Sequence, residues 1–264
     1  MSTDVGGIEA VLRRDRVVIL AAVTAVTAVG WAYLGYVTWN MRDMGPMTMA
    51  SAMVMPRADH WGTVELPVLF LMWTMMMVAM MVPSATPLVL MFAWANRRQG
   101  NGSRVVGSAA MLLLGYLFVW TGFSGLAAWA QWSLHNAALL SSMMASTSGL
   151  LSGLLLLAAG AYQFTPLKRA CLDHCRSPLG FVTSEWRGGR WGAFIMGLKH
   201  GGYCVGCCWI LMSLLLVAGV MNLLWVAVLA VFVLLEKVIP VGQRLGRLAG
   251  ALLVIDGARR IMTT

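Results

Sequence analysis

Charged residues are scarce in this chain, since Asp, Glu, Lys and Arg make up only 11% of its 264 residues. A soluble domain carries about 25% charged residues, so the composition excludes an ordinary soluble enzyme. Disorder is excluded as well, because a disordered chain combines low hydrophobicity with high charge. Here 59% of the residues are hydrophobic and the mean hydropathy is +0.77. These values predict an integral membrane protein that is held in the lipid bilayer.

The apolar residues fall into six stretches, each close to the length of about 20 residues that a transmembrane helix needs. They are Val17–Trp39, Leu66–Trp94, Val105–Trp132, Gly149–Phe164, Trp191–Val220 and Leu223–Ile239. A seventh segment, within 245–264, carries charges at both ends. It is expected to form an amphipathic helix on the membrane surface, with a short re-entrant span as the alternative. The sequence thus predicts an all-α, polytopic membrane bundle that forms one domain over 1–264.

The distribution of positive charge predicts how these spans are oriented. The net charge is +9, and of nineteen Lys and Arg residues sixteen fall on alternate connections, while the other connections hold only Arg42 and Arg57. By the positive-inside rule, both termini, including residues 1–16, and the basic loop 165–190 are expected in the cytoplasm. The loop 40–65 is then on the outer side. In a membrane protein this charge serves orientation, so nucleic acid is not an expected partner.

Three of the five cysteines follow a histidine at helical spacing, in the string His200-x-x-x-Cys204-x-x-Cys207-Cys208. At about 100° per residue, these four side chains share one face of a helix. Thiols and an imidazole on one stripe at membrane depth are costly in lipid, so they indicate a functional site. The ligand types favour a metal, with Cu(I) the expected ion. Packing of small apolar thiols in the core is the alternative.

The other two cysteines, Cys171 and Cys175, lie in the predicted cytoplasmic loop. Their CxxxC spacing places two soft ligands on consecutive turns of a helix, and His174 or Asp173 could add a third ligand. No second pair stands at zinc-finger spacing. A pair of cysteines without a metal therefore explains this segment equally well.

Methionine is concentrated in the outer loop, where six Met residues occur within fifteen positions. Thioethers are soft, neutral ligands that select Cu(I), and outside the cytoplasm they do not cross-link when oxidised. We therefore expect Met41, Met44 and Met47, at MxxM spacing, to capture or release Cu(I) at the outer surface. A hydrophobic flap at the membrane interface is the alternative.

A second group of methionines repeats at every fourth residue of the second span. Met72, Met76 and Met80 form a stripe on one helix face, which would be lipid-facing or packing if it has no ligand role. At about 1.5 Å per residue, Met76 lies roughly 15 Å below the outer end of its span. Cys204 lies roughly 20 Å above the inner end of the fifth span, so the two depths overlap in a core about 30 Å thick. A route for Cu(I) from the outer loop to the His–Cys face is predicted.

Four segments together carry a resemblance to a known family. They read Met72-Trp73-x-x-Met76-x-x-Ala79-Met80-Met81-x-Pro83, Tyr162-Gln163-x-x-Pro166-Leu167-Lys168-x-x-Cys171, Cys175-Arg176-Ser177-Pro178 and His200-Gly201-x-Tyr203-Cys204-x-Gly206-Cys207-Cys208-Trp209. Over about residues 66–242, the chain resembles a bacterial family of metal-binding integral membrane proteins that includes a membrane partner of bacterial tyrosinase. The resemblance implies bound copper, a place in the bacterial cytoplasmic membrane, and a role in supplying copper to a partner enzyme.

Three functions remain open at this point. The first is a copper-binding accessory protein that holds Cu(I) and passes it to a copper enzyme or another membrane subunit. The second is a copper permease, although no P-loop or other energy-coupling motif is present. The third is a subunit of a membrane copper oxidase or monooxygenase; a complete oxidase is not expected from only four, widely spread histidines. No catalytic acid or base is evident, since Glu236 and Lys237 are expected to form an ion pair near the cytoplasmic interface.

Overall fold

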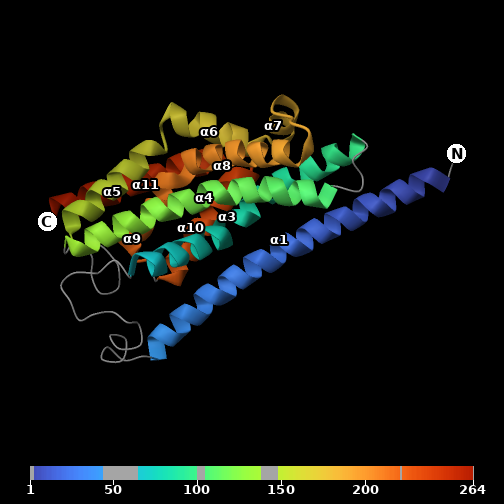
Figure 1. The fold of residues 1–264 in the computed structure, drawn as a ribbon. Coiled ribbons are helices and arrows are strands. Elements are labelled where there is room, and N and C mark those ends of the chain that lie inside the picture. The colour runs from blue at the N-terminus through green and yellow to red at the C-terminus, as the bar shows by residue number, and fades with distance from the viewer. Residues whose placement is uncertain (1–2, 44–64, 100–104, 138–147, 221, 264) are drawn as a thin grey trace.

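The computed structural model describes residues 3–43, 65–99, 105–137, 148–220 and 222–263 of the chain, and every element in those residues is a helix (Figure 1). The helices are α1 Thr3–Asp43, α3 Glu65–Arg98, α4 Val105–Asn136, α5 Gly149–Tyr162, α6 Pro166–Arg176, α7 Pro178–Ser184, α8 Gly189–Ser213, α9 Leu215–Ala218, α10 Leu223–Val238 and α11 Gly242–Met262. The all-α prediction is confirmed in the described residues.

Four helices in this part of the chain are long and apolar enough to cross a membrane: Arg14–Trp39, Glu65–Arg98, Val105–Asn136 and Gly189–Ala218. A fifth span is possible if α5 and α6, which meet at an angle of 64°, are taken as one. Helix α10 covers only 16 residues. The expected membrane bundle is therefore supported, but the expected number of six spans is not confirmed.

Glycines allow α4 and α8 to pack closely. A Cβ atom at Gly115 would overlap the carbonyl oxygen of Phe194, and one at Gly197 would overlap that of Leu112. Small residues at such crossings let two backbones approach, which is the usual way that helices associate in lipid. Further along the pair, a Cβ at Gly107 would meet Arg190 and one at Gly201 would meet Val119, so the contacts advance in the same direction and α4 and α8 are parallel. The face of α8 that carries the predicted metal ligands is thus held against α4.

The C-terminal helix α11 packs along α5 through a second set of glycines. A Cβ at Gly160 would lie 2.7 Å from the carbonyl oxygen of Gly250, and one at Gly257 would lie 2.8 Å from that of Gly153. The two helices are therefore antiparallel, and α11 ends beside the start of α5. The N- and C-terminal ends of the described chain consequently lie at opposite ends of the bundle (Figure 1). The expectation that both termini lie in the cytoplasm stays a prediction.

The segment 165–190, predicted as a loop, is mostly helical and lies against the bundle. Thr165 caps α6, because its hydroxyl accepts a hydrogen bond from the Lys168 backbone N–H, and Pro166 occupies the first turn. Helix α6 is strongly amphipathic: Lys168 and Leu172 are buried, while Arg169 and Asp173 are exposed. Its inner face packs on α8, which brings Cys171 and Cys175 to the predicted metal ligands.

Candidate metal-binding site

The four predicted ligands on α8 are all buried. His200 is 3% exposed, Cys207 is 1% exposed, and Cys204 and Cys208 are fully buried. The helix carries them on one side because they recur at intervals of three and four residues. This side faces α3, α4, α6 and α10 rather than the surface of the bundle.

Cys204 lies at the centre of a buried hydrogen-bond cluster built from four helices. Its Sγ atom is 2.8 Å from Lys237 Nζ on α10 and 3.0 Å from the Tyr116 hydroxyl on α4. Lys237 also donates to Ser84 Oγ on α3, at 3.1 Å. The Tyr116 hydroxyl is 3.1 Å from the Met81 carbonyl oxygen and donates to it. A single sulfur atom is thus contacted by an ammonium and a phenol away from bulk water.

The two neighbouring cysteines, Cys207 and Cys208, form hydrogen bonds with the backbone instead of with Lys237 or Tyr116. The Cys207 and Cys208 thiols donate hydrogen bonds to the Cys204 carbonyl oxygen, at 3.1 Å and 2.9 Å. Such bonds to the preceding turn use the S–H proton, so both of these cysteines are neutral thiols in this arrangement.

Helix α6 adds a cysteine to this group. The Cys175 side chain interacts with the side chains of Cys204 and Cys207. Cys171 lies one turn away, against α8 at Gly206, where a Cβ would come within 2.8 Å of its Sγ atom. The structure therefore gathers cysteines from two segments that are separated in sequence by about 30 residues. All five are free in the described structure.

Neither histidine lies among the thiols as a ready ligand. The His174 ring is exposed and stacks on Tyr203, with 4.2 Å between ring centroids. The His200 ring packs between Tyr116 and Phe181, at centroid distances of 5.8 Å and 5.3 Å. In the described part of the chain, the His200 Nδ1 atom has no hydrogen-bond partner. His174 is thus directed away from Cys175, whereas His200 remains one helical turn from Cys204.

Asp173, the other candidate in the α6 segment, also faces outward and accepts a hydrogen bond of 2.6 Å from Gln243 on α11. Over the described residues, no three His, Cys, Asp or Glu side chains converge as a ready metal site. The donor set nevertheless suits a soft ion of low coordination number, because such an ion needs as few as two sulfur ligands.

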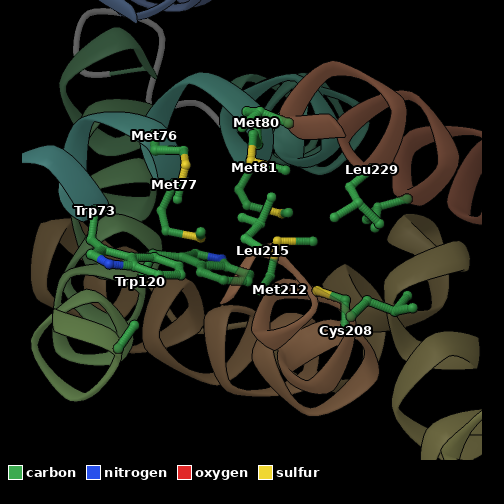
Figure 2. Packing of buried hydrophobic residues seen from close by; sticks show 14 of the residues in the cluster. Trp73, Met76, Met77, Met80, Met81, Trp120, Cys208, Met212, Leu215 and Leu229 are labelled. Carbon is green, nitrogen blue, oxygen red and sulfur yellow. The ribbon is translucent and has the colours of Figure 1, made fainter. Parts of the chain in front are cut away.

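The methionine stripe of α3 lies in the core and does not face lipid. Met72, Met76 and Met80 are 8%, 1% and 2% exposed. Met77 and Met81, on the intervening positions, are fully buried. Figure 2 shows the side chains of Met77, Met81 and Met212 pointing toward one another between α3 and α8, with Cys208 nearby.

The stripe pattern missed Met77, Met81 and Met212. A period of four residues selects only one face of α3, and Met77 and Met81 lie on other faces. Met212 lies on another helix, α8. Burial shows that α3 is surrounded, so several of its faces contact the core. Of the predicted outer-loop ligands, Met41 lies in α1, and Met44 and Met47 lie outside the described residues.

A second buried polar cluster lies next to the thiols. Lys168 of α6 pairs with Glu236 of α10 at 2.7 Å and also donates to the side chain of Gln163. Lys168 and Glu236 are each 2% exposed. The expected ion pair between Glu236 and Lys237 is therefore wrong, since the two side chains have different partners. Lys237 was not predicted as a member of the site. The only signal in the sequence was that an ionisable residue follows a long apolar run.

Comparison with known proteins places these features in a family. The family model PpoB2, described as a copper chaperone, matches residues 70–259, which include most of α3, all of α4 to α10 and most of α11. Comparisons with curated proteins and with solved structures gave no match.

Proposed function

Because the chain belongs to the PpoB2 family of copper chaperones, we propose that it holds Cu(I) on the thiols of α6 and α8 and delivers the ion to a copper enzyme. Cu(I) is the cargo in this proposal. The ligands are Cys204 with Cys175 or Cys207, and His200 and Cys208 lie close enough to serve during exchange. Thiolates select Cu(I) among the biological oxidation states of copper.

The observation that carries the proposal is the meeting of Cys175 and Cys204. One lies on α6 and the other on α8, and the half-buried Cys175 side chain packs against the core beside Cys204. Random burial of apolar cysteines does not explain why a lysine hydrogen-bonds one of them. A pair of sulfur atoms is sufficient for Cu(I), and ions move between such pairs by exchange of ligands without an acid or base catalyst.

The level of the site in the membrane follows from the exposed arginines around it. Helices α5 and α10 end beside α6, near Gln163 and Glu236, and α11 begins there. Arg169, Arg244 and Arg247 are exposed at this level. Arginines concentrate on the cytoplasmic side of a membrane, so we place the thiols near the cytoplasmic boundary of the inner membrane, with the N-terminus in the cytoplasm.

The buried methionines supply a path from the opposite end of the bundle. Met72 and Met76 precede Met77 and Met81 along α3, and this row leads from the end where α3 begins toward Cys208 (Figures 1 and 2). Thioethers bind Cu(I) without adding charge, which suits transient sites in an apolar core. In this proposal Met41, Met44 and Met47 begin the path.

The first experiment measures copper in the detergent-purified chain. Wild type loaded with Cu(I) is expected to retain copper after dialysis against a weak competitor, and the Cys204→Ser/Cys207→Ser double variant is expected to lose most of it. The Cys171→Ser variant serves as a matched control, because this thiol is at the edge of the group. Equal copper in wild type and in the double variant would refute the proposed ligands.

A second experiment separates delivery from permeation. Deletion of the chain is expected to leave a partner copper enzyme without metal while total cell copper hardly changes, and excess copper is expected to restore the enzyme. The reason is that good ligands ending in a tight thiol site hold an ion, whereas a conduit needs weak, evenly matched sites. A large change in cell copper with fully active copper enzymes would identify a permease instead.

A further inference from the structure

Lys237 is a buried cation that no carboxylate neutralises in the described structure. It is 7% exposed, and its ammonium contacts Cys204 Sγ and Ser84 Oγ. The ion pairs of the described residues do not include it. The other deeply buried lysine, Lys168, has the carboxylate of Glu236 as its partner.

Charge balance identifies the partner of Lys237. An ammonium in a low-dielectric interior is costly unless an anion lies beside it. Ser84 is neutral, and the Tyr116 hydroxyl gives its proton to the Met81 carbonyl. Cys207 and Cys208 use their protons on the Cys204 backbone. The remaining candidate is the Cys204 sulfur, which lies 2.8 Å from Lys237 Nζ and becomes an anion when a metal ion replaces its proton.

We propose that Lys237 sets the charge of the ion that this site prefers, by acting as a fixed counter-charge to a pair of thiolates. The inference rests on the proposed function. Two thiolates, one monovalent ion and one ammonium sum to zero charge. A divalent ion on the same two thiolates leaves the buried site with a charge of plus one, which the interior disfavours. Lys237 is therefore a selectivity residue that acts on the ion through Cys204.

Ag(I) and Hg(II) provide a matched pair of probes, because both bind two thiolates in a linear geometry and they differ by one unit of charge. The purified full-length chain is equilibrated with both ions in the presence of a competing thiol, and the bound ratio is measured by mass spectrometry of the metals. We expect the Ag(I)-to-Hg(II) ratio of Lys237→Met to fall by about tenfold or more relative to wild type, given the strength of a charge–charge interaction at this distance. Lys237→Arg should keep the wild-type ratio.

A purely structural role for Lys237 would lower the affinity for both ions together and leave their ratio unchanged, and that result would overturn the inference. Lys237→Gln, which keeps a polar contact to Ser84, replaces Lys237→Met if the latter does not fold. Lys199→Met is the control, since it removes an equal charge from a partly exposed pair with Glu185. If wild type binds neither ion at Cys204, the proposed function fails. If wild type binds both ions but the Ag(I)-to-Hg(II) ratio does not change when the charge at position 237 is removed, only the inference about Lys237 fails.

Discussion

Glu236 and Lys237 are consecutive residues near the end of α10, and their side chains join two separate polar clusters. Glu236 pairs with Lys168 on α6, whereas Lys237 contacts Cys204 on α8. Consecutive residues on a helix point about 100° apart, so one turn of α10 reaches both neighbours. The end of α10 thereby joins the two helices that carry all five cysteines.

The first prediction concerns the pair of Lys168 and Glu236. The Glu236→Leu variant leaves a buried ammonium without its anion, so we expect it to lose about 3–5 kcal/mol of stability. Adding Lys168→Met should recover most of this loss, because removing both charges also removes the cost of desolvating them. Unfolding in mixed micelles, followed by circular dichroism, measures the change for the single and double variants.

The control for this cycle is an exposed ion pair of α11. Asp256 accepts hydrogen bonds from Arg259 and Arg260, with side chains that are largely open to the surroundings. Asp256→Asn is expected to change stability by less than about 1 kcal/mol. If Glu236→Leu also lost less than about 1 kcal/mol of stability, the prediction would be wrong, and the Lys168 charge would have another partner in the folded protein.

The second prediction concerns the close packing of α5 and α11. A Cβ at Gly160 would come within 2.7 Å of the Gly250 carbonyl oxygen, so Gly160→Ala must push the helices apart. We expect a loss of about 1–3 kcal/mol. Gly122→Ala is the matched control on α4, since nothing lies within 4 Å of its added Cβ. That variant should be neutral or slightly stabilising, because Ala favours helix more than Gly does.

The sequence predicted the helical class because its apolar stretches are long enough to cross a membrane, and it predicted the common face of α8 because the spacing of the four residues repeats with the helix. It could not predict that Cys175 meets Cys204, since this depends on how α6 folds back on α8 after the break at 163–165. The same limit explains the error over Glu236. Adjacent opposite charges suggest a local pair, and only the packing of α6 and α8 on either side of α10 shows that each charge has a distant partner.

The stripe of methionines illustrates a related limit. Spacing identifies the face that Met72, Met76 and Met80 share, but it does not tell whether lipid or protein covers that face. The structure buries them together with Met77 and Met81 because α3 packs against α1, α4, α7 and α10. In a protein whose exposed surface is itself apolar, hydrophobicity cannot distinguish the two environments.

The third prediction tests whether α6 contributes a ligand. Cys175→Ser removes the sulfur that interacts with Cys204, and we expect at least a tenfold weaker retention of Ag(I) against a competing thiol. His174→Ala changes the adjacent residue, whose ring stacks on Tyr203 away from the thiols, and should bind Ag(I) as wild type does. Equal binding by both variants would assign the site to α8 alone.

The fourth prediction tests the methionine path. A triple variant with Leu at positions 77, 81 and 212 keeps similar side-chain volumes, and each such change usually costs less than about 1.5 kcal/mol. We expect the final Cu(I) occupancy of the thiols to be unchanged, while the thiolate absorbance rises several-fold more slowly after mixing. Met262→Leu, at a side chain that is 86% exposed, is the control. Loading at the wild-type rate would show that the buried thioethers only fill the core.

The fifth prediction concerns the course of α11. Since α11 runs antiparallel to α5 and the two chain ends lie at opposite ends of the bundle, reporters fused to the termini should report opposite sides of the membrane. A periplasm-active enzyme and a cytoplasm-active fluorescent protein, exchanged between the two termini, measure this. Cytoplasmic signals from both ends would place α11 on the surface, as the charge pattern alone predicts.

The order in which the site's members occur along the chain has a consequence for biosynthesis. Ser84 and Tyr116 emerge from the ribosome first, then the cysteines of α6 and α8, and Lys237 on α10 emerges last. Until α10 is inserted, the Cys204 sulfur lacks the ammonium of Lys237, and a thiolate at this position is costly in lipid. On the proposed function, an incomplete chain would therefore hold neutral thiols, and copper would be sequestered only when assembly in the membrane is nearly finished.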